Sequence, residues 1–294
     1  MARALIGPRE WKDRPTLLVF WGVSTIVTVL ALLTLLPFVW MLLTSFRPAD
    51  DLFQFPVRWL PSHWDFSSYG QALGRLPLLR YLSNTLVICV AVVIGQLTLS
   101  ALAAYALARL KPRYAALWAL AFAATLMVPV EALVVPLYLQ MRSFPTGQSG
   151  WGINLLNTPW ALILPGLVSA FNIFVLRSFF ARLPGEILDS ARLDGCSEWG
   201  TFFRFVLPLT RPILVVLGIF GFIAAWNGFF WPLVALSDPA QYTLMLGVQK
   251  MLETGEPWNI VMAAVTLTTL PTVLLFLALQ RWITRGLAFS GLYQ

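Results

Sequence analysis

The side chains that most often carry out chemistry in proteins are scarce in this chain. His63 is the only histidine, and Cys89 and Cys196 are the only cysteines, far apart in the sequence. Zinc and iron–sulfur sites need several such ligands at short spacing, so the sequence predicts no metal site. There is also no G-x-x-x-x-G-K-[ST] phosphate loop and no G-x-S-x-G elbow. We therefore expect no enzyme, and no ATP hydrolysis by this chain alone.

A second kind of candidate is an ionisable side chain inside a long apolar stretch. Glu131 lies in such a stretch, between Pro129 and Pro136. A carboxylate is costly to place in lipid, so it is a functional candidate. Two interpretations stay open: the carboxylate accepts hydrogen bonds from backbone donors freed by a broken helix, or it contacts a solute.

Amides beside aromatic rings form the third group of candidates. Asn227 lies between Trp226 and Trp231, and this combination suits the hydroxyl groups and flat faces of sugar rings. Packing between helices is the alternative for Asn227, because three glycines on the same stretch favour close approach: Gly218, Gly221 and Gly228. Asn172, in the preceding apolar stretch, has the same two interpretations.

The composition indicates the elements that must position these residues. Of the 294 residues, 59% are hydrophobic and 11% are charged, with a mean hydropathy of +0.76. Soluble domains carry about 25% charged residues, so we expect an all-α integral membrane protein forming one transmembrane domain over residues 1–294. About 20 apolar residues cross a bilayer. Six stretches meet that length: 16–45, 83–108, 115–140, 160–181, 209–236 and 260–283.

The basic residues indicate the orientation of these spans. The formal net charge is +7, and the basic residues fall in short runs between the apolar stretches. Nucleic-acid binding would need them gathered on one face, so we expect no nucleic-acid partner. With the N-terminus inside, 14 of the 20 basic residues lie on the cytoplasmic side of the predicted spans, so the positive-inside rule places both termini in the cytoplasm.

The segment between the fourth and fifth apolar stretches, residues 182–208, differs from the rest of the chain. Pro184 and Gly185 end the preceding helix, and acidic residues follow in the first turns of a new one. Gly195 permits a sharp turn, and Ser197 can cap a second helix. The sequence predicts a helix, a turn and a helix, too short and too charged to span a membrane. A plain interfacial loop is the alternative.

The same segment carries a recognisable spacing: an acid followed by two small residues, a glycine four positions later, and Phe-x-Leu-Pro at its end. The residues concerned are Asp189, Ser190, Ala191, Gly195, Phe205, Leu207 and Pro208. This pattern resembles the E-A-A…G…I-x-L-P loop of ABC-importer permease subunits, with Asp, Ser and Phe as conservative replacements. The resemblance extends to residues 84–110, 126–139, 222–236 and 285–291, and it is closest to the carbohydrate-uptake family of six-span, maltose-permease G-type subunits.

The resemblance implies a type I ABC-importer permease fold in a bacterial or archaeal inner membrane. It implies four kinds of partner: a second homologous permease subunit, two cytoplasmic ABC ATPase subunits that bind ATP and Mg, an external solute-binding protein, and the bilayer. No cofactor is expected on this chain. The helix around Asp189 would be the coupling helix that docks on an ATPase subunit. The coupling residues would be Glu186, Asp189, Ser190, Ala191, Asp194, Gly195, Leu207 and Pro208.

The expected solute is a sugar or a sugar-like molecule, such as an oligosaccharide or a glycosylated polyol. No Lys or Arg lies well inside a predicted span, so an anionic solute would lack a counter-charge in this subunit. The candidate pathway residues are Glu131, Asn172, Trp226, Asn227 and Trp231. Two alternatives remain: an importer of glycerol phosphate, and a stand-alone secondary transporter in which only Glu131 could serve in ion coupling.

Overall fold

The structure, a computed structural model, describes residues 14–291 except 57, 76 and 148–151. Within these residues the chain is helical, and its only strand-like pairing is a single bridge between Phe144 and Ile153. The chain divides into two compact units, which are described separately. The first comprises the described part of Met1–Gly74 together with Gly255–Thr266, and the second comprises Arg75–Thr254 together with the described part of Leu267–Gln294.

The first unit consists of a long apolar helix and an ordered segment that follows it. Helix α1 (Arg14–Ser45) has an apolar stretch that is not buried anywhere within the described chain. Beyond α1, the buried guanidinium of Arg47 lies 4.7 Å from the ring centroid of Trp40 and donates to the carbonyls of Arg58 and Trp59. These contacts fix the connection that includes η2 (Ala49–Asp51) and leads to α2 (Ser67–Arg75).

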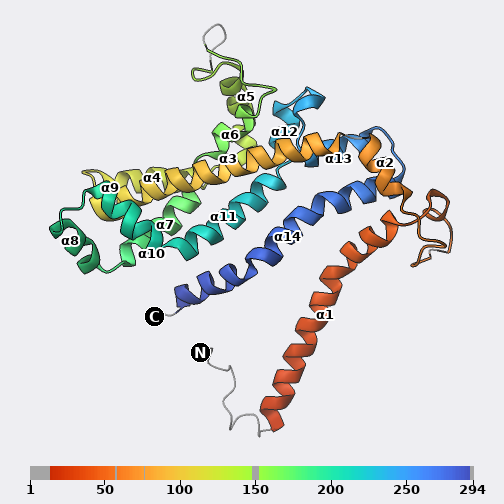
Figure 1. The fold of residues 1–294 in the computed structure, drawn as a ribbon, viewed down its shortest axis with the longest axis horizontal. Helices are drawn as coiled ribbons and strands as arrows, with labels where there is room; N and C mark the ends of the chain where they lie inside the picture. The colour runs from red at the N-terminus through yellow and green to blue at the C-terminus, as the bar shows by residue number, and fades with distance from the viewer. Residues whose placement is uncertain (1–13, 57, 76, 148–151, 292–294) are drawn as a thin grey trace. The chain divides into compact units, whose positions relative to one another are not determined.

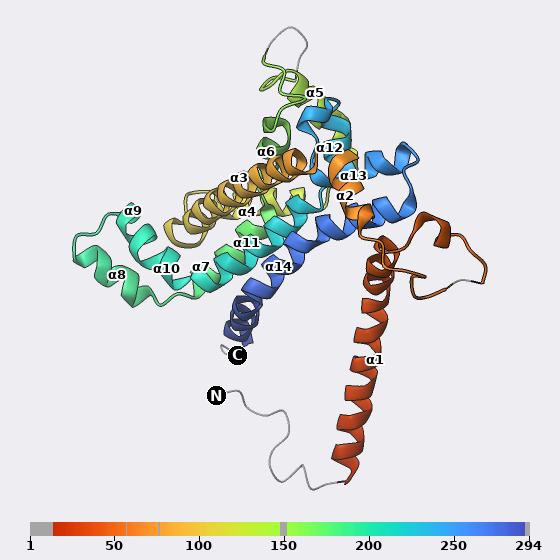
Figure 2. The ribbon, with the colours of Figure 1, turned by 45° about the vertical axis from the view of Figure 1, so that its right-hand side comes forward.

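The second unit is built around α3 (Leu78–Tyr105), which ends in a π-helical turn, η3 (Ala106–Leu110). Helices α7 (Ala170–Arg182) and α11 (Arg211–Trp226) pack against α3 (Figure 1). Turning the molecule by 45° shows the same three helices side by side (Figure 2).

Glycines on α11 make the contact with α3 close. A Cβ atom built on Gly218 would lie 3.3 Å from Leu97 Cδ1, and one built on Gly221 would lie 3.0 Å from Gln96 Oε1. The close-packed face that the sequence predicted at these two glycines is therefore confirmed. Gly228 differs, because a Cβ there would meet the carbonyl of Ala225 in its own turn, at 3.2 Å.

The remaining elements are one more long helix, α14, with 34 residues, and a series of shorter helices and turns. They are α4 (Ala115–Thr125), η4 (Val130–Leu133), α5 (Val134–Arg142), α6 (Trp160–Gly166), α8 (Gly185–Leu193), α9 (Glu198–Thr201), η5 (Phe202–Val206), α10 (Leu207–Leu209), α12 (Phe230–Ala235), η6 (Pro239–Gln241), α13 (Leu244–Glu253) and α14 (Trp258–Gly291). Helix α14 begins in the first unit and continues into the second.

Four helical segments of the described chain are long and apolar enough to cross a membrane: Leu17–Ser45, Leu78–Leu110, Trp160–Arg182 and Trp258–Gln280. A fifth is present if Glu198–Leu209 and Arg211–Trp226, which are bent by 77°, count as one span. These segments correspond to the predicted stretches 16–45, 83–108, 160–181, 260–283 and part of 209–236.

The predicted stretch 115–140 does not form one continuous helix. Helix α4 ends at Thr125, and helical structure resumes only at Val130. Pro129 explains the break, because it has no N–H to donate and it disfavours the helical conformation of the residue before it. The stretch 209–236 is similarly divided, since α11 ends at Trp226 and α12 begins at Phe230.

Candidate functional site

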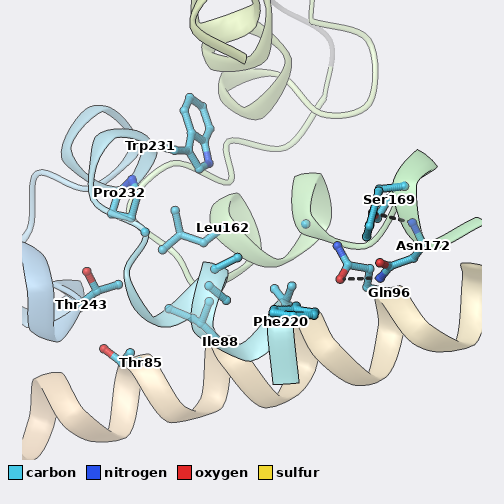
Figure 3. Close-up of a pocket in the computed structure, with 17 residues that line it drawn as sticks. Thr85, Ile88, Gln96, Leu162, Ser169, Asn172, Phe220, Trp231, Pro232 and Thr243 are labelled. Atoms are coloured by element: carbon cyan, nitrogen blue, oxygen red, sulfur yellow. Dashed lines mark hydrogen bonds between the residues drawn. The ribbon is translucent and has the colours of Figure 1, made fainter. Parts of the chain in front are cut away.

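The second unit contains a cavity of about 400 Å³ between α3, α6, α7, α11 and α12, called here the pocket (Figure 3). Its polar lining consists of hydroxyls and amides, from Thr85, Gln96, Ser169, Asn172 and Thr243. Its aromatic lining comes from Phe171, Phe220 and Trp231. None of the described residues that line the pocket carries a charged side chain. A cavity with apolar walls and a few polar groups is the usual form of a small-molecule site.

Two amides meet at one wall of the pocket. Asn172 is buried, with 5% of its surface exposed, and its Nδ2 atom donates to Gln96 Oε1 at 3.2 Å. Both side chains can donate and accept hydrogen bonds. A hydroxyl group of a solute has the same two capacities, so this pair can bind hydroxyls without any change of protonation.

The local chain path places Asn172 at the pocket. Pro165 and Gly166 lie at the end of α6, and α7 starts only at Ala170, so the predicted fourth span contains a break. Ser169 caps α7 by accepting a hydrogen bond from the backbone N–H of Asn172 at 3.2 Å. The first turn of α7 therefore faces the pocket, and Figure 3 shows the two hydrogen bonds of Asn172.

Trp231 supplies an aromatic side chain to the opposite part of the lining. Its indole Nε1 donates to the carbonyl of Ala161 at 2.9 Å, which fixes the ring. A fixed aromatic side chain in the same pocket as hydroxyl-binding amides is the combination that suits a sugar ring.

The other three predicted pathway residues lie outside the pocket lining. Trp226 is buried, stacks on Phe222 at 5.4 Å and donates to the carbonyl of Thr268 at 3.1 Å, as a packing residue does. Asn227 is exposed at the end of α11. Glu131 is exposed in η4, and its carboxylate forms no hydrogen bond or ion pair with the described residues.

Sequence reasoning missed Gln96, Ser169 and the two lining threonines. Gln96 is an amide inside an apolar stretch, which is the same signal that selected Asn172. Ser169 follows Pro165 and Gly166 in the sequence, and this order is typical of a helix break followed by a new cap. Both signals were present, but the pairing of Gln96 with Asn172 depends on how two distant helices pack.

A hydrogen-bonded hairpin, residues 185–206, lies at the end of α3 and α7 that is away from the pocket (Figure 1). The predicted helix, turn and helix are confirmed: α8 ends at Leu193, and Gly195 has a φ of +81°. Cys196 N–H donates to the carbonyl of Ala191 and Gly195 N–H to that of Arg192, each at 3.0 Å, which is the Schellman arrangement. As predicted, Ser197 caps α9, with its Oγ accepting from Gly200 N–H at 3.2 Å.

One side of the hairpin is buried against α3 and α7. Leu188 and Ala191 are each 2% exposed, and they belong to a core that includes Tyr105, Phe180 and Phe202. The small side chain of Ala191 therefore serves packing within the chain. Leu207, in the following turn, packs on the same core.

The opposite side of the hairpin is exposed. It presents four polar residues of the predicted coupling set, Glu186, Asp189, Ser190 and Asp194, and Pro208 is exposed just beyond it. It also presents large apolar side chains: Leu193 is 89% exposed, Trp199 63% and Phe203 57%. The rings of Trp199 and Phe203 stack at 6.1 Å. Exposed apolar side chains on an ordered surface are typical of a site that contacts a protein or a membrane.

Ion pairs connect the two helices of the hairpin. Arg192 contacts Asp189 Oδ1 and Glu198 Oε1, both at 2.9 Å, and the Tyr105 hydroxyl donates to Glu198 Oε2 at 2.7 Å. The hydrogen bonds from Arg192 and then from Tyr105 lower the pKa of Glu198 below its ordinary value. The hydrogen bond to Glu198 raises the pKa of Arg192.

Among the residues that the structure describes, no three His, Cys, Asp or Glu side chains are grouped so as to hold a metal ion. Cys89 is buried and Cys196 is half-buried, and both are free thiols.

Comparison with known proteins identifies the family. Residues 14–289 match the family described as the inner membrane component of binding-protein-dependent transport systems. The chain is 35% identical to the sn-glycerol-3-phosphate transport system permease protein UgpE of Pectobacterium atrosepticum, over 95% of this chain and 99% of that protein. It is also 35% identical to the sulfoquinovosyl glycerol transport system permease protein SmoH of Agrobacterium fabrum, over 88% of each chain.

A third relative and a solved structure extend the comparison. The arabinooligosaccharides transport system permease protein AraQ of Halalkalibacterium halodurans is 30% identical, over 95% of this chain and 99% of that protein. The fold matches a chain of a bacterial ABC transporter involved in the import of alginate, with a TM-score of 0.80 and 22% identity, covering 92% of this chain and 98% of that one. The chain therefore belongs to the family of multi-pass inner-membrane components of binding-protein-dependent transport systems.

Proposed function

We propose that this chain is the permease subunit of an ATP-driven, binding-protein-dependent importer, and that it moves a sugar-like solute by alternating access. The observation that carries the proposal is the hairpin, which is buried against α3 and α7 on one side and exposed on the other. An ordered surface of this kind suits a coupling element, because a rigid helix can transmit the motion of a docked protein to the helices behind it. ATP and Mg would be bound by the partner ATPase subunits.

In this proposal α8 is the coupling helix. Leu193 would enter an apolar contact on an ATPase subunit, and the carboxylates of Glu186, Asp189 and Asp194 would meet basic groups there. Ala191 and Gly195 act within the chain, since Ala191 is buried and Gly195 forms the turn.

The proposed topology has six spans with both termini in the cytoplasm. The broken segment from α4 to α5 would provide the third crossing, and α11 with α12 the fifth. The unburied apolar surface of α1 would be covered by lipid or by the second permease subunit. Tags at both ends should be protected from protease in sealed right-side-out vesicles, and cleavage of either tag would contradict the six-span topology.

The proposed solute is a neutral, hydroxyl-rich molecule such as an oligosaccharide or a glycosylated polyol. The pocket offers amides, hydroxyls and aromatic rings, and none of the described residues that line it is a cation. An external solute-binding protein would deliver the solute. Glycerol phosphate is the alternative, favoured by the name of the UgpE relatives. Its phosphate would then have to bind outside this pocket, because a desolvated anion needs a charged or strong donor partner.

The experiment that tests the coupling proposal changes the exposed face of α8. Leu193→Arg and Asp189→Arg should leave the membrane level of the permease unchanged, because both side chains are largely exposed. Each should reduce co-purification of the co-expressed ATPase by roughly tenfold, the effect of about 1.4 kcal/mol of lost binding. Leu60→Arg and Asp50→Arg, at exposed positions far along the chain from the hairpin, are the matched controls. Normal co-purification and normal solute-stimulated ATP hydrolysis in both hairpin variants would contradict the proposal.

A further inference from the structure

Helix α3 makes specific polar contacts at both ends and in the middle. Near its first turns, Asn84 Nδ2 donates to the carbonyls of Ala240 and Tyr242, each at 3.1 Å, and the Thr85 hydroxyl accepts from Leu244 N–H at 2.8 Å. In the middle, Gln96 accepts the hydrogen bond of Asn172 at the pocket. The same helix therefore holds the segment before α13 at its first turns and supplies Gln96 to the pocket at its middle.

At its last residue, α3 is joined to the hairpin through one carboxylate. Glu198 accepts from the Tyr105 hydroxyl at 2.7 Å and from Arg192 Nε at 2.9 Å, and Arg192 also binds Asp189 on α8. Three elements, α3, α8 and α9, are thereby linked by side chains.

Groups other than the Glu198 carboxylate form the cap and the turn of the hairpin. Ser197 already caps α9, and the turn at Gly195 is closed by backbone hydrogen bonds. The apolar core around Leu188 and Phe202 attaches the hairpin to α3, but apolar contacts are not directional and permit rotation and sliding. Hydrogen bonds to an ionised group are directional and stronger than neutral ones, so the Glu198 link is suited to fixing the angle between the hairpin and α3.

We propose that Glu198 is a positioning residue for energy coupling: by joining Arg192 to the Tyr105 hydroxyl, it makes the hairpin and α3 move as one piece. This inference rests on the proposed docking of the hairpin on an ATPase subunit. Displacement of the hairpin is then carried along α3 to Gln96, nine residues or roughly 13 Å away along the helix axis. The hydrogen bond between Gln96 and Asn172 is where that displacement reaches the solute.

A second contact supports motion of α3 together with α7. Arg109, in the turn that follows α3, donates through Nε to the carbonyl of Phe180 at 2.8 Å and through Nη2 to that of Leu183. The end of α7 is thus tied to α3 beside the hairpin. The wall of the pocket that carries Gln96 and Asn172 belongs to these two helices. Trp231 lies on α12, which follows α11, and a bend of 77° at Thr210 separates α11 from the hairpin.

The test compares uptake per ATP hydrolysed in the reconstituted complete transporter. Tyr105→Phe removes one hydroxyl, Glu198→Gln removes the charge, and the double variant removes both. Assembly and solute-stimulated ATP hydrolysis should stay within about twofold of wild type, while uptake per ATP falls about threefold or more in each variant. The double variant should be no worse than the single variants, because all three break the same link.

Two matched controls should keep the wild-type ratio of uptake to hydrolysis. Tyr69→Phe removes a hydroxyl that makes a 2.7 Å hydrogen bond with Ser45. Glu253→Gln breaks the 2.7 Å ion pair between Glu253 and Lys250, and the side chains of that pair are about as exposed as those of Glu198 and Arg192. Both lie away from the hairpin in sequence.

Each outcome decides the matter. Wild-type uptake per ATP in Tyr105→Phe and Glu198→Gln would overturn the proposal. Loss of assembly in both variants would show that the link serves folding, and this would also overturn the proposal. If only Glu198→Gln fails to assemble, the result for Tyr105→Phe decides, because that variant keeps the ion pair between Glu198 and Arg192. Absence of ATP-dependent uptake by the assembled wild-type transporter would instead contradict the proposed function.

Discussion

Asn172 on α7 donates its side-chain amide to Gln96 on α3 at 3.2 Å, although the two residues lie in different predicted spans. The pair forms a polar patch on a pocket wall that has no charged residue among those described. One hydrogen bond joins the two amides, and each side chain keeps a further donor or acceptor for a hydroxyl.

The amide pair gives a prediction about stability and uptake together. Asn172→Leu leaves Gln96 Oε1 without this donor, and Gln96→Leu leaves Asn172 Nδ2 without its acceptor, so each single variant should lose about 1–3 kcal/mol of stability. The double Leu variant should recover much of that stability, because both partners become apolar. Uptake should be impaired in all three, measured beside the melting temperature of the purified protein. Normal uptake by the stable double variant would contradict a solute contact at this pair.

The two neighbouring tryptophans should behave differently. Trp231→Phe keeps an aromatic ring at the pocket but loses the Nε1 donor that fixes it, so the apparent affinity for solute should weaken while the protein stays assembled. Trp226→Phe loses a buried hydrogen bond to the carbonyl of Thr268 and should mainly lower the melting temperature.

Asn227→Leu serves as the control for these tryptophan variants, since Asn227 is exposed outside the pocket. It should leave the apparent affinity unchanged. A shift in solute selectivity with Asn227→Leu, and none with Trp231→Phe, would show that the solute path lies elsewhere.

Gly195 should be sensitive because of its backbone conformation. At a φ of +81°, a β-branched side chain is strained, although a Cβ atom would meet nothing within 4 Å in the described chain. Gly195→Val should therefore cost about 1–3 kcal/mol in the hairpin and reduce ATPase co-purification. Gly195→Asn should be milder, because asparagine adopts this conformation more readily. Equal losses in the two variants would contradict backbone strain as the cause.

The ion pair of Glu198 predicts a dependence of stability on pH. Because hydrogen bonds from Arg192 and Tyr105 lower the pKa of Glu198 below 4.5, its ionised form stabilises the folded hairpin above that pH. The contribution is lost as the pH falls through the lowered pKa, where the carboxylate is protonated. It should be no more than about 1 kcal/mol, because the pair is largely solvent exposed.

The melting temperatures of wild type and Glu198→Gln measure this contribution. Wild type should melt higher at neutral pH, and the difference should close under acid conditions. A difference that is absent at neutral pH, or that persists unchanged in acid, would show that the charge of Glu198 does not stabilise the hairpin.

The hairpin could be predicted from neighbouring residues in the sequence, whereas the pocket depends on how distant helices pack. Gly195 and Ser197 specify a turn and a cap by their own chemistry, so the order of helix, turn and helix follows from nearby residues. Asn172 and Gln96 meet only because α3 and α7 pack together, which the polarity of either stretch does not reveal. Glu131 and Asn227 show the converse: polarity within an apolar stretch marked them, but the described chain leaves both exposed.

The breaks in the predicted spans have a similar explanation. Hydropathy averages over a window and therefore joined 115–140 into one stretch, whereas Pro129 acts on the backbone of its immediate neighbours. The close approach of α11 to α3 was predictable, because Gly218 and Gly221 share one face at helical spacing.

Solute flux in proteoliposomes tests the central claim most directly. The purified chain alone should give no flux with or without a proton gradient, because the proposal places energy coupling on partner subunits. Uptake should appear when the second permease, the ATPase pair and the solute-binding protein are added and ATP is supplied on the side of the membrane that carries the ATPase subunits. It should stop when ATP is replaced by a non-hydrolysable analogue. Solute flux through the chain alone, driven by a proton gradient or running down its own gradient, would contradict the importer assignment and favour a stand-alone transporter.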